Sequence, residues 1–102
     1  MLTLCIRYRI DHHKLRDFEV YARALAQPIR RCGGELTGYY LPTRFAGRTN
    51  EALALIGFPD LAAYERYREA LARDQGAEEC LARVERSDCI VSEDRSFLQQ
   101  VS

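Results

Sequence analysis

Apolar and polar residues alternate at the start of the chain. Every second side chain from residue 2 to residue 10 is apolar: Leu2, Leu4, Ile6, Tyr8 and Ile10. The intervening positions hold Thr3, Cys5, Arg7 and Arg9. A period of two, with β-branched and aromatic residues, is typical of a strand that has two different faces. The pattern therefore predicts a first strand over residues 2–10.

The following segment has helical spacing. Apolar residues recur at positions 15, 18, 22, 25 and 29, and Asp11 is a candidate N-cap. Pro28 interrupts this pattern and should kink or end the helix near Gln27, with one further turn possible before the glycine pair 33–34.

Two more strands are predicted in the middle of the chain. Residues 35–41 form the first, with Tyr39 and Tyr40 on opposite faces. Residues 51–58 form the second and are almost entirely apolar. A strand that is apolar on both faces is expected to be buried on both sides of its sheet.

The last third of the chain predicts two helices and a weak strand. Asp60 starts a helix, which residues 74–76 are expected to end. A short third helix should follow from Ala77 to Val84, and residues 95–101 are a candidate final strand with a poor alternation.

An internal similarity links the first two helices. Residues 15–25 and 61–71 share Leu, an aromatic residue, Glu, Tyr, Ala and Leu at six equivalent positions, 46 residues apart. The similarity reflects either a duplicated β-α-β unit or the common demands of two amphipathic helices. Two such units predict an α+β, ferredoxin-like split βαβ fold, with a four-stranded antiparallel sheet, two main helices and a short third.

Such a fold covers only one face of its sheet. Leu53, Leu55, Cys5 and either Tyr39 or Tyr40 would lie on the other face, where they would favour aggregation in a monomer. Twofold symmetry is the commonest in oligomers. We therefore expect a homodimer joined through the sheet faces, a dimeric α/β barrel.

Composition narrows the protein class. The 102 residues, 47% hydrophobic and 29% charged, are ordinary for one soluble domain over residues 1–102. Fifteen basic residues balance fifteen acidic ones, which gives no reason to expect nucleic acid or a membrane as partner. Residues 1–50 nevertheless carry five excess positive charges and residues 51–102 five excess negative ones. These charges either form complementary faces in an oligomer or become neighbours on one surface.

The cysteine and leader patterns favour a cytoplasmic protein. None of the four cysteines forms a CxxC pair, so neither a zinc site nor a redox dithiol is predicted. The apolar start is too short for a secretory signal, which favours reduced thiols. Cys32, beside two glycines, is either a packing residue or an exposed thiol.

Several segments together resemble the NIPSNAP family. They are Cys5-Ile-Arg-Tyr-Arg-Ile-Asp-His-His-Lys-Leu-Arg-Asp-Phe18, Gly34-Glu-Leu-Thr-Gly-Tyr-Tyr40, Thr49-Asn-Glu-Ala-Leu-Ala-Leu-Ile-Gly-Phe58 and Asp60-Leu-Ala-Ala-Tyr-Glu-Arg66. The order and spacing of the segments carry the resemblance, which implies a dimeric α/β-barrel fold but no defined chemistry. Ile6, Ile56 and the pair His12-His13 stand where the family often has Arg, Trp and Pro-Gly.

Candidate pocket residues are Arg7, Tyr8, Tyr39 and Tyr40. Tyrosine combines an apolar ring with a hydroxyl, and the guanidinium of Arg7 or Arg9 is a fork for a carboxylate. Such a pocket would lie between helices and sheet or inside the barrel, and the alternative role of these side chains is core and interface packing. His12 and His13 are adjacent, so they cannot chelate one metal from a helix face.

Two functions remain open at this level. The first is a small homodimeric protein that binds a small apolar or aromatic ligand or a protein partner. The second is a cofactor-independent monooxygenase or isomerase acting on a small aromatic substrate, which rests on fold analogy. No catalytic residue, metal ligand or cofactor is predicted, and the chain contains no tryptophan that would suit haem chemistry.

Overall fold

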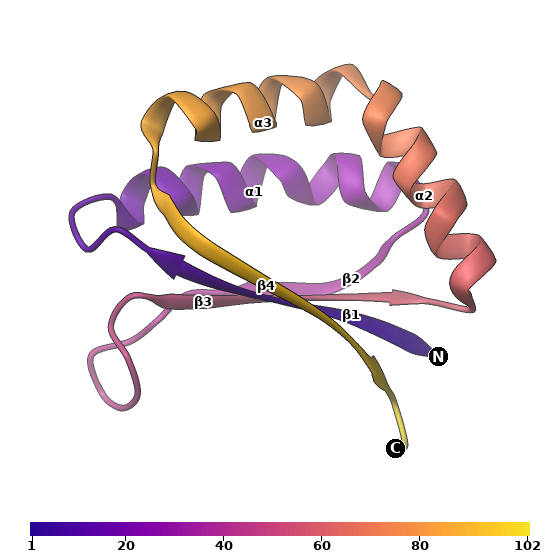
Figure 1. Cartoon of the computed structure of the whole chain (residues 1–102), viewed down its shortest axis with the longest axis horizontal. Coiled ribbons are helices and arrows are strands. Elements are labelled where there is room, and N and C mark those ends of the chain that lie inside the picture. Colours follow the sequence, from indigo (N-terminus) through magenta and orange to yellow (C-terminus); the bar gives the residue numbers. More distant parts are fainter.

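The computed structural model describes residues 1–102 as four strands and three helices. In chain order they are β1 (Leu2–Ile10), α1 (Leu15–Arg31), β2 (Glu35–Tyr40), β3 (Glu51–Phe58), α2 (Leu61–Arg73), α3 (Gln75–Ser87) and β4 (Ile90–Gln99). The strands form one antiparallel sheet in the order β2-β3-β1-β4. All three helices lie on the same side of that sheet (Figure 1). The predicted α+β, ferredoxin-like fold is confirmed.

The two faces of β1 have different environments. Leu4, Ile6, Tyr8 and Ile10 lie beneath the helices and are buried in the core. Arg7 and Arg9 lie on the opposite face and are exposed. The alternation in the sequence therefore positions the Tyr8 side chain between sheet and helices.

One core fills the space between sheet and helices. It contains seventeen buried residues, and its largest fully buried side chains include Tyr8, Phe18 and Phe58. Burying a side chain of this kind stabilises the fold by roughly 1.5–3 kcal/mol. At the end of α1, a Cβ on Gly34 would come within 2.9 Å of the side chains of Ile29 and Ile56. Only glycine lets the backbone approach the core this closely.

The structure corrects the predicted start of α1. Lys14 is the N-cap residue, and no side chain caps this helix. The Asp11 carboxylate instead accepts a hydrogen bond from the backbone N–H of His13, at 2.9 Å. Asp11 thus stabilises the turn before the helix, and its prediction as the N-cap is wrong.

Of the two ends expected for α1, the structure shows the later one, with a further turn beyond Pro28 before Gly33 and Gly34. The helix continues through Pro28 to Arg31. Pro28 has no backbone N–H to donate to the helix. Its carbonyl still accepts the N–H of Cys32 at 3.0 Å, and its ring is buried. Gly33, with φ of 107°, ends the helix in a conformation that favours glycine.

Asp74 alone separates α2 from α3. Its carboxylate accepts the N–H of Ala77 and caps α3. This helix starts at Gln75 and has 13 residues like α2, so it is longer than the short helix expected from Ala77 to Val84. The carboxylate also receives two hydrogen bonds of 2.8 Å from the Arg31 guanidinium. This pairing lowers the pKa of Asp74 far below its usual range, with a further contribution from the Ala77 N–H. The junction is thereby joined to the end of α1, and α3 lies alongside α1 (Figure 1).

The final strand is longer than the sequence indicates. β4 starts at Ile90 and pairs with β1 along its length, with an irregularity at Arg9 and Ile10. The residue after β4 lies beside the start of β1, where the Gln100 N–H donates to the Met1 carbonyl at 3.3 Å. The two ends of the chain therefore lie close together (Figure 1).

The sheet face opposite the helices carries apolar side chains. Register pairs Leu53 with both Arg7 and Tyr40, and Leu55 with Cys5, so all five side chains share that face. Tyr40 is exposed and Tyr39 is not, because Tyr39 points toward the helices. None of the three helices combines the length and the apolar character that crossing a bilayer would require.

Candidate ligand-binding site

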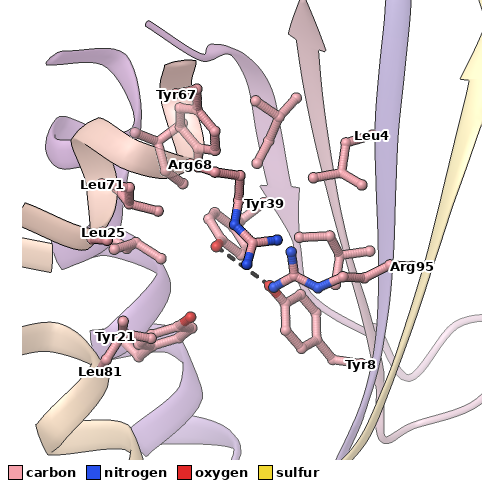
Figure 2. A pocket seen from close by; sticks show the side chains of 14 residues that line it. Leu4, Tyr8, Tyr21, Leu25, Tyr39, Tyr67, Arg68, Leu71, Leu81 and Arg95 are labelled. Carbon is pink, nitrogen blue, oxygen red and sulfur yellow. Dashed lines mark hydrogen bonds between the residues drawn. The ribbon is translucent and has the colours of Figure 1, made fainter. Parts of the chain in front are cut away.

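A cavity of about 350 Å³ lies between the sheet and the helices. Twelve of its fourteen lining residues are apolar or aromatic: Leu4, Ile6, Tyr8, Tyr21, Leu25, Ile29, Tyr39, Ile56, Tyr67, Leu71, Ala72 and Leu81. The other two are Arg68 and Arg95. Every helix and every strand contributes at least one of these side chains (Figure 2). Ligand sites are commonly apolar cavities of this size with a few convergent polar groups.

Aromatic rings from the first half of the chain form one wall. The Tyr8 ring lies 4.9 Å from that of Phe18 and 6.1 Å from that of Tyr39, between centroids. The Tyr8 and Tyr39 hydroxyls are 3.5 Å apart (Figure 2). The tilted and edge-on arrangement of these rings is the one that aromatic pairs prefer. The wall is therefore ordered by packing before any ligand enters.

The tyrosines of the cavity are neutral hydrogen-bonding groups. Burial raises the pKa of Tyr8, Tyr21 and Tyr39 far above the usual value for a phenol. Burial also raises the pKa of Tyr67 to about 12. A phenol in this state donates and accepts hydrogen bonds but does not act as a base near neutral pH.

Two arginines provide the positive charge of the cavity. Arg68 comes from α2 and Arg95 from β4, and their guanidinium groups point toward one another near the hydroxyls of Tyr8 and Tyr39 (Figure 2). Both residues are exposed, so they lie where the cavity meets solvent. No aspartate or glutamate is among the lining residues.

Each arginine has one partner in the protein. Arg95 forms an ion pair of 2.9 Å with Glu93, which is outside the lining. Burial lowers the pKa of Arg95, but the charge and hydrogen bond of Glu93 outweigh this effect and raise it. The Arg68 guanidinium donates to the Tyr64 hydroxyl at 3.0 Å and lies over that ring, 6.0 Å from its centroid.

The structure separates the four residues predicted to line a pocket. Tyr8 and Tyr39 line the cavity from β1 and β2. Arg7 and Tyr40 lie on the opposite sheet face, in a shallow hollow beside the loop between β2 and β3. The positive charge of the cavity comes from Arg68 and Arg95 instead of Arg7 or Arg9.

Sequence reasoning did not assign four of the functional groups. Tyr21 and Tyr67 belong to apolar helix stripes, where core packing is the ordinary expectation. Arg68 lies on the same stripe as Tyr67, and this charged residue within an apolar stripe was the available signal. Arg95 belongs to the strand with the weakest pattern and gave no signal.

Other chemistry-bearing residues are not brought together. His12 and His13 lie exposed in the turn before α1, and Glu65 and Glu69 are exposed on α2. The Cys32 thiol contacts Asp74 at 3.6 Å, and its burial together with that carboxylate raises its pKa, which disfavours the reactive thiolate. No three His, Cys, Asp or Glu side chains are grouped as metal ligands.

Sequence comparison gives the family. Residues 3–102 match the NIPSNAP family. The chain belongs to the NIPSNAP family. No functionally curated protein matches the sequence significantly.

Solved structures agree with this NIPSNAP assignment. An uncharacterized NIPSNAP domain protein from Burkholderia xenovorans superposes with a TM-score of 0.82 at 20% identity, covering 100% of this chain and 96% of that one. SnoaB, a cofactor-independent oxygenase from Streptomyces nogalater, gives 0.68 at 15% identity, with 99% and 93% covered. A putative antibiotic biosynthesis monooxygenase from Nitrosomonas europaea gives 0.70 at 11% identity, with 100% of both chains covered. At these identities the superpositions establish a shared fold.

Proposed function

We propose that this NIPSNAP protein is a homodimeric binding protein that takes a small aromatic ligand into the cavity between sheet and helices. The single observation that carries the proposal is the cavity wall itself, with four tyrosines and eight aliphatic side chains around about 350 Å³. This volume fits a ligand of one or two fused rings. The neutral hydroxyls of Tyr8 and Tyr39 would orient polar substituents of that ligand.

A mouth-blocking variant tests the proposal. Ala72 lines the cavity from α2 and is exposed, so Ala72→Trp fills the entrance without disturbing the core. Ala62→Trp is the matched control, because Ala62 is exposed on the same helix and outside the lining. We expect naphthalene derivatives to bind the wild type and Ala62→Trp, and Ala72→Trp to bind about tenfold more weakly by calorimetry. Equal affinity in both variants, or no binding to the wild type, would overturn the proposal.

The second copy of the chain would cover the open sheet face. Leu53 and Leu55 lie at the centre of this face, with Tyr40 on β2 and Leu98 on β4. Arg7 and Asp94 are register neighbours on the same face, so the face carries both signs of charge. An apolar centre that also carries both signs of charge can contact a second copy of itself without like-charge repulsion, which favours a second copy as occupant.

Sedimentation velocity tests the dimer. Leu55→Glu places a charge at the centre of the open face and should convert a dimer to monomer. Leu61→Glu is the control, since Leu61 is 58% exposed at the start of α2. A wild-type protein that sediments as a monomer at micromolar concentration would contradict the proposal.

A second candidate function is a cofactor-independent monooxygenase. The similarity in fold to an oxygenase and to a putative monooxygenase supports it. Such a reaction would convert a phenol and O₂ into a quinone and water, with the substrate as the source of electrons. Consumption of one O₂ for each quinone formed, lost in Ala72→Trp, would be the expected result with a dihydroxynaphthalene. An oxygen electrode trace equal to that of the buffer would reject the activity for this substrate class.

A further inference from the structure

We infer that the ligand is an aromatic monoanion whose acidic group is held between Arg68 and Arg95, while its ring extends into the cavity. The inference rests on the proposed function and specifies its ligand class. It also assigns Arg68 and Arg95 as the residues that determine specificity. The acidic group of the ligand lies at the solvent side of the cavity. The ring of the ligand contacts aliphatic residues of the inner wall, such as Ile29 and Ile56.

The first argument is the convergence of two like charges. Arg68 and Arg95 come from elements far apart in the sequence, yet their guanidinium groups point toward one another (Figure 2). Both guanidinium groups line one largely apolar cavity, where an opposite charge is attracted more strongly than in water. An anion between the two groups would interact with both, so the fold positions the arginines for one.

The second argument is the number of free donors. A guanidinium group carries five N–H donors. One terminal nitrogen of Arg95 donates a hydrogen bond to the Glu93 carboxylate, and one terminal nitrogen of Arg68 donates to the Tyr64 hydroxyl. No other side-chain hydrogen bond engages either residue, so both retain donors that suit the planar oxygens of a carboxylate.

The third argument concerns the net charge that a ligand meets. Glu93 compensates one of the two arginines, and its side chain lies outside the cavity lining. The four lining tyrosines stay neutral because burial raises each pKa. One positive charge is therefore left uncompensated, which favours a monoanion such as an arylcarboxylate over a dianion such as a phosphate monoester.

A pair of isosteric probes isolates the charge. Naphthoate and naphthamide have the same ring and nearly the same shape, but only naphthoate is an anion at neutral pH. We expect calorimetry to give about tenfold tighter binding of naphthoate, with an affinity that falls as salt is added. Binding of both probes with equal affinity would overturn the inference and leave the proposed binding function standing. Absence of binding for both would overturn the two together.

Three variants locate the charge that is responsible. Arg68→Gln and Arg95→Gln should each weaken naphthoate binding about tenfold and leave naphthamide binding unchanged. Arg66→Gln is the matched control, because Arg66 is exposed on the same helix and does not line the cavity. A loss of naphthoate affinity of equal size in Arg66→Gln would show a general effect of surface charge and contradict the assignment. Thermal melting of each variant verifies that it is folded.

Discussion

Each β-α-β unit of the chain contains an aromatic cluster, and the two clusters differ in how far they are closed. The first cluster is Tyr8, Phe18, Tyr21 and Tyr39, and the second is Phe58, Tyr64, Tyr67 and Phe97. Both combine one residue from the leading strand, two from the helix and one from the following strand. In the first cluster no ring is exposed, whereas Phe97 in the second is 41% exposed.

The internal similarity shows where the two units diverge. Tyr21 and Tyr67 occupy equivalent helix positions, and both line the cavity. One residue further on, Ala22 is buried in the first unit, and Arg68 is exposed at the cavity in the second. The same pattern thus forms a closed wall in one unit and a charged entrance in the other.

The largest expected difference between the clusters is in stability. Phe18→Ala removes a ring with no exposure from the first cluster and should lower the free energy of unfolding by about 3–5 kcal/mol. Phe97→Ala in the second should cost about 1 kcal/mol, because much of this ring already contacts solvent. Urea denaturation of the two variants measures the difference. Equal losses would mean that β4 is covered as well as β2 is.

The second difference concerns stability at high pH. The raised pKa of Tyr8 means that the folded protein holds the phenol proton more tightly than the unfolded chain does. Stability is therefore fully present below the ordinary phenol pKa of about 10 and is lost as the pH rises above it. Tyr8→Phe has no phenol proton to lose. The difference in free energy of unfolding between this variant and wild type should therefore shift in favour of the variant by about 1.4 kcal/mol from pH 8 to pH 11.

Tyr64→Phe is the control for this prediction. Tyr64 belongs to the second cluster and is only half-buried, beside Arg68. Comparing the two phenols tests how far the effect at pH 11 depends on burial of the hydroxyl. An identical pH dependence in wild type and Tyr8→Phe would refute the burial of that hydroxyl.

Strong periodicity made much of the fold predictable. The bounds of β1 and β3 agree with the sequence pattern, because one face of β1 and both faces of β3 have a distinct apolar character. β4 begins five residues earlier than expected, since Ser92–Ser96 is polar on both faces of this edge strand. A pattern argument detects a buried face, and this segment has none to detect.

The cavity was predictable only in part. Tyr8 and Tyr39 could be proposed from strand patterns, because aromatic residues on a buried strand face contact either the core or a cavity within it. The convergence of Arg68 and Arg95 depends on how α2 packs over β4, which is a tertiary arrangement without a local signal. Residues 74–76 predict a helix break, but no local pattern indicates that Asp74 caps α3 and pairs with Arg31.

The helix junction offers a third, smaller difference. Asp60 and Asp74 both cap a helix, but only Asp74 is also bound by an arginine. Asp74→Ala should lower the melting temperature by on the order of 5 °C and Asp60→Ala by less, as followed by circular dichroism. The contribution of Asp74 is present above its ordinary pKa of about 4 and declines as acid protonates the carboxylate. Equal shifts in the two variants would indicate that the Arg31 pair adds nothing.

The smallest expected effect is on the stability of a site variant. Arg68→Ala should change the free energy of unfolding by less than about 0.5 kcal/mol, because its side chain is exposed and pairs only with a phenol. This prediction separates a residue kept for a ligand from one kept for packing. A loss of unfolding free energy as large as that in Phe18→Ala would mean that Arg68 serves the packing of the fold.

The contact between Gln100 and Met1 has a topological consequence. Because the two ends of the chain meet beside β1 and β4, a short linker could close the backbone into a ring. Opening that ring in the exposed loop around Phe45 would give a permuted chain that begins with β3 and ends with β2. The order of the two β-α-β units would be exchanged, while every strand kept its neighbours. The fold is thus a cycle of two related halves, and the present start of the chain is one of two equivalent places to cut it.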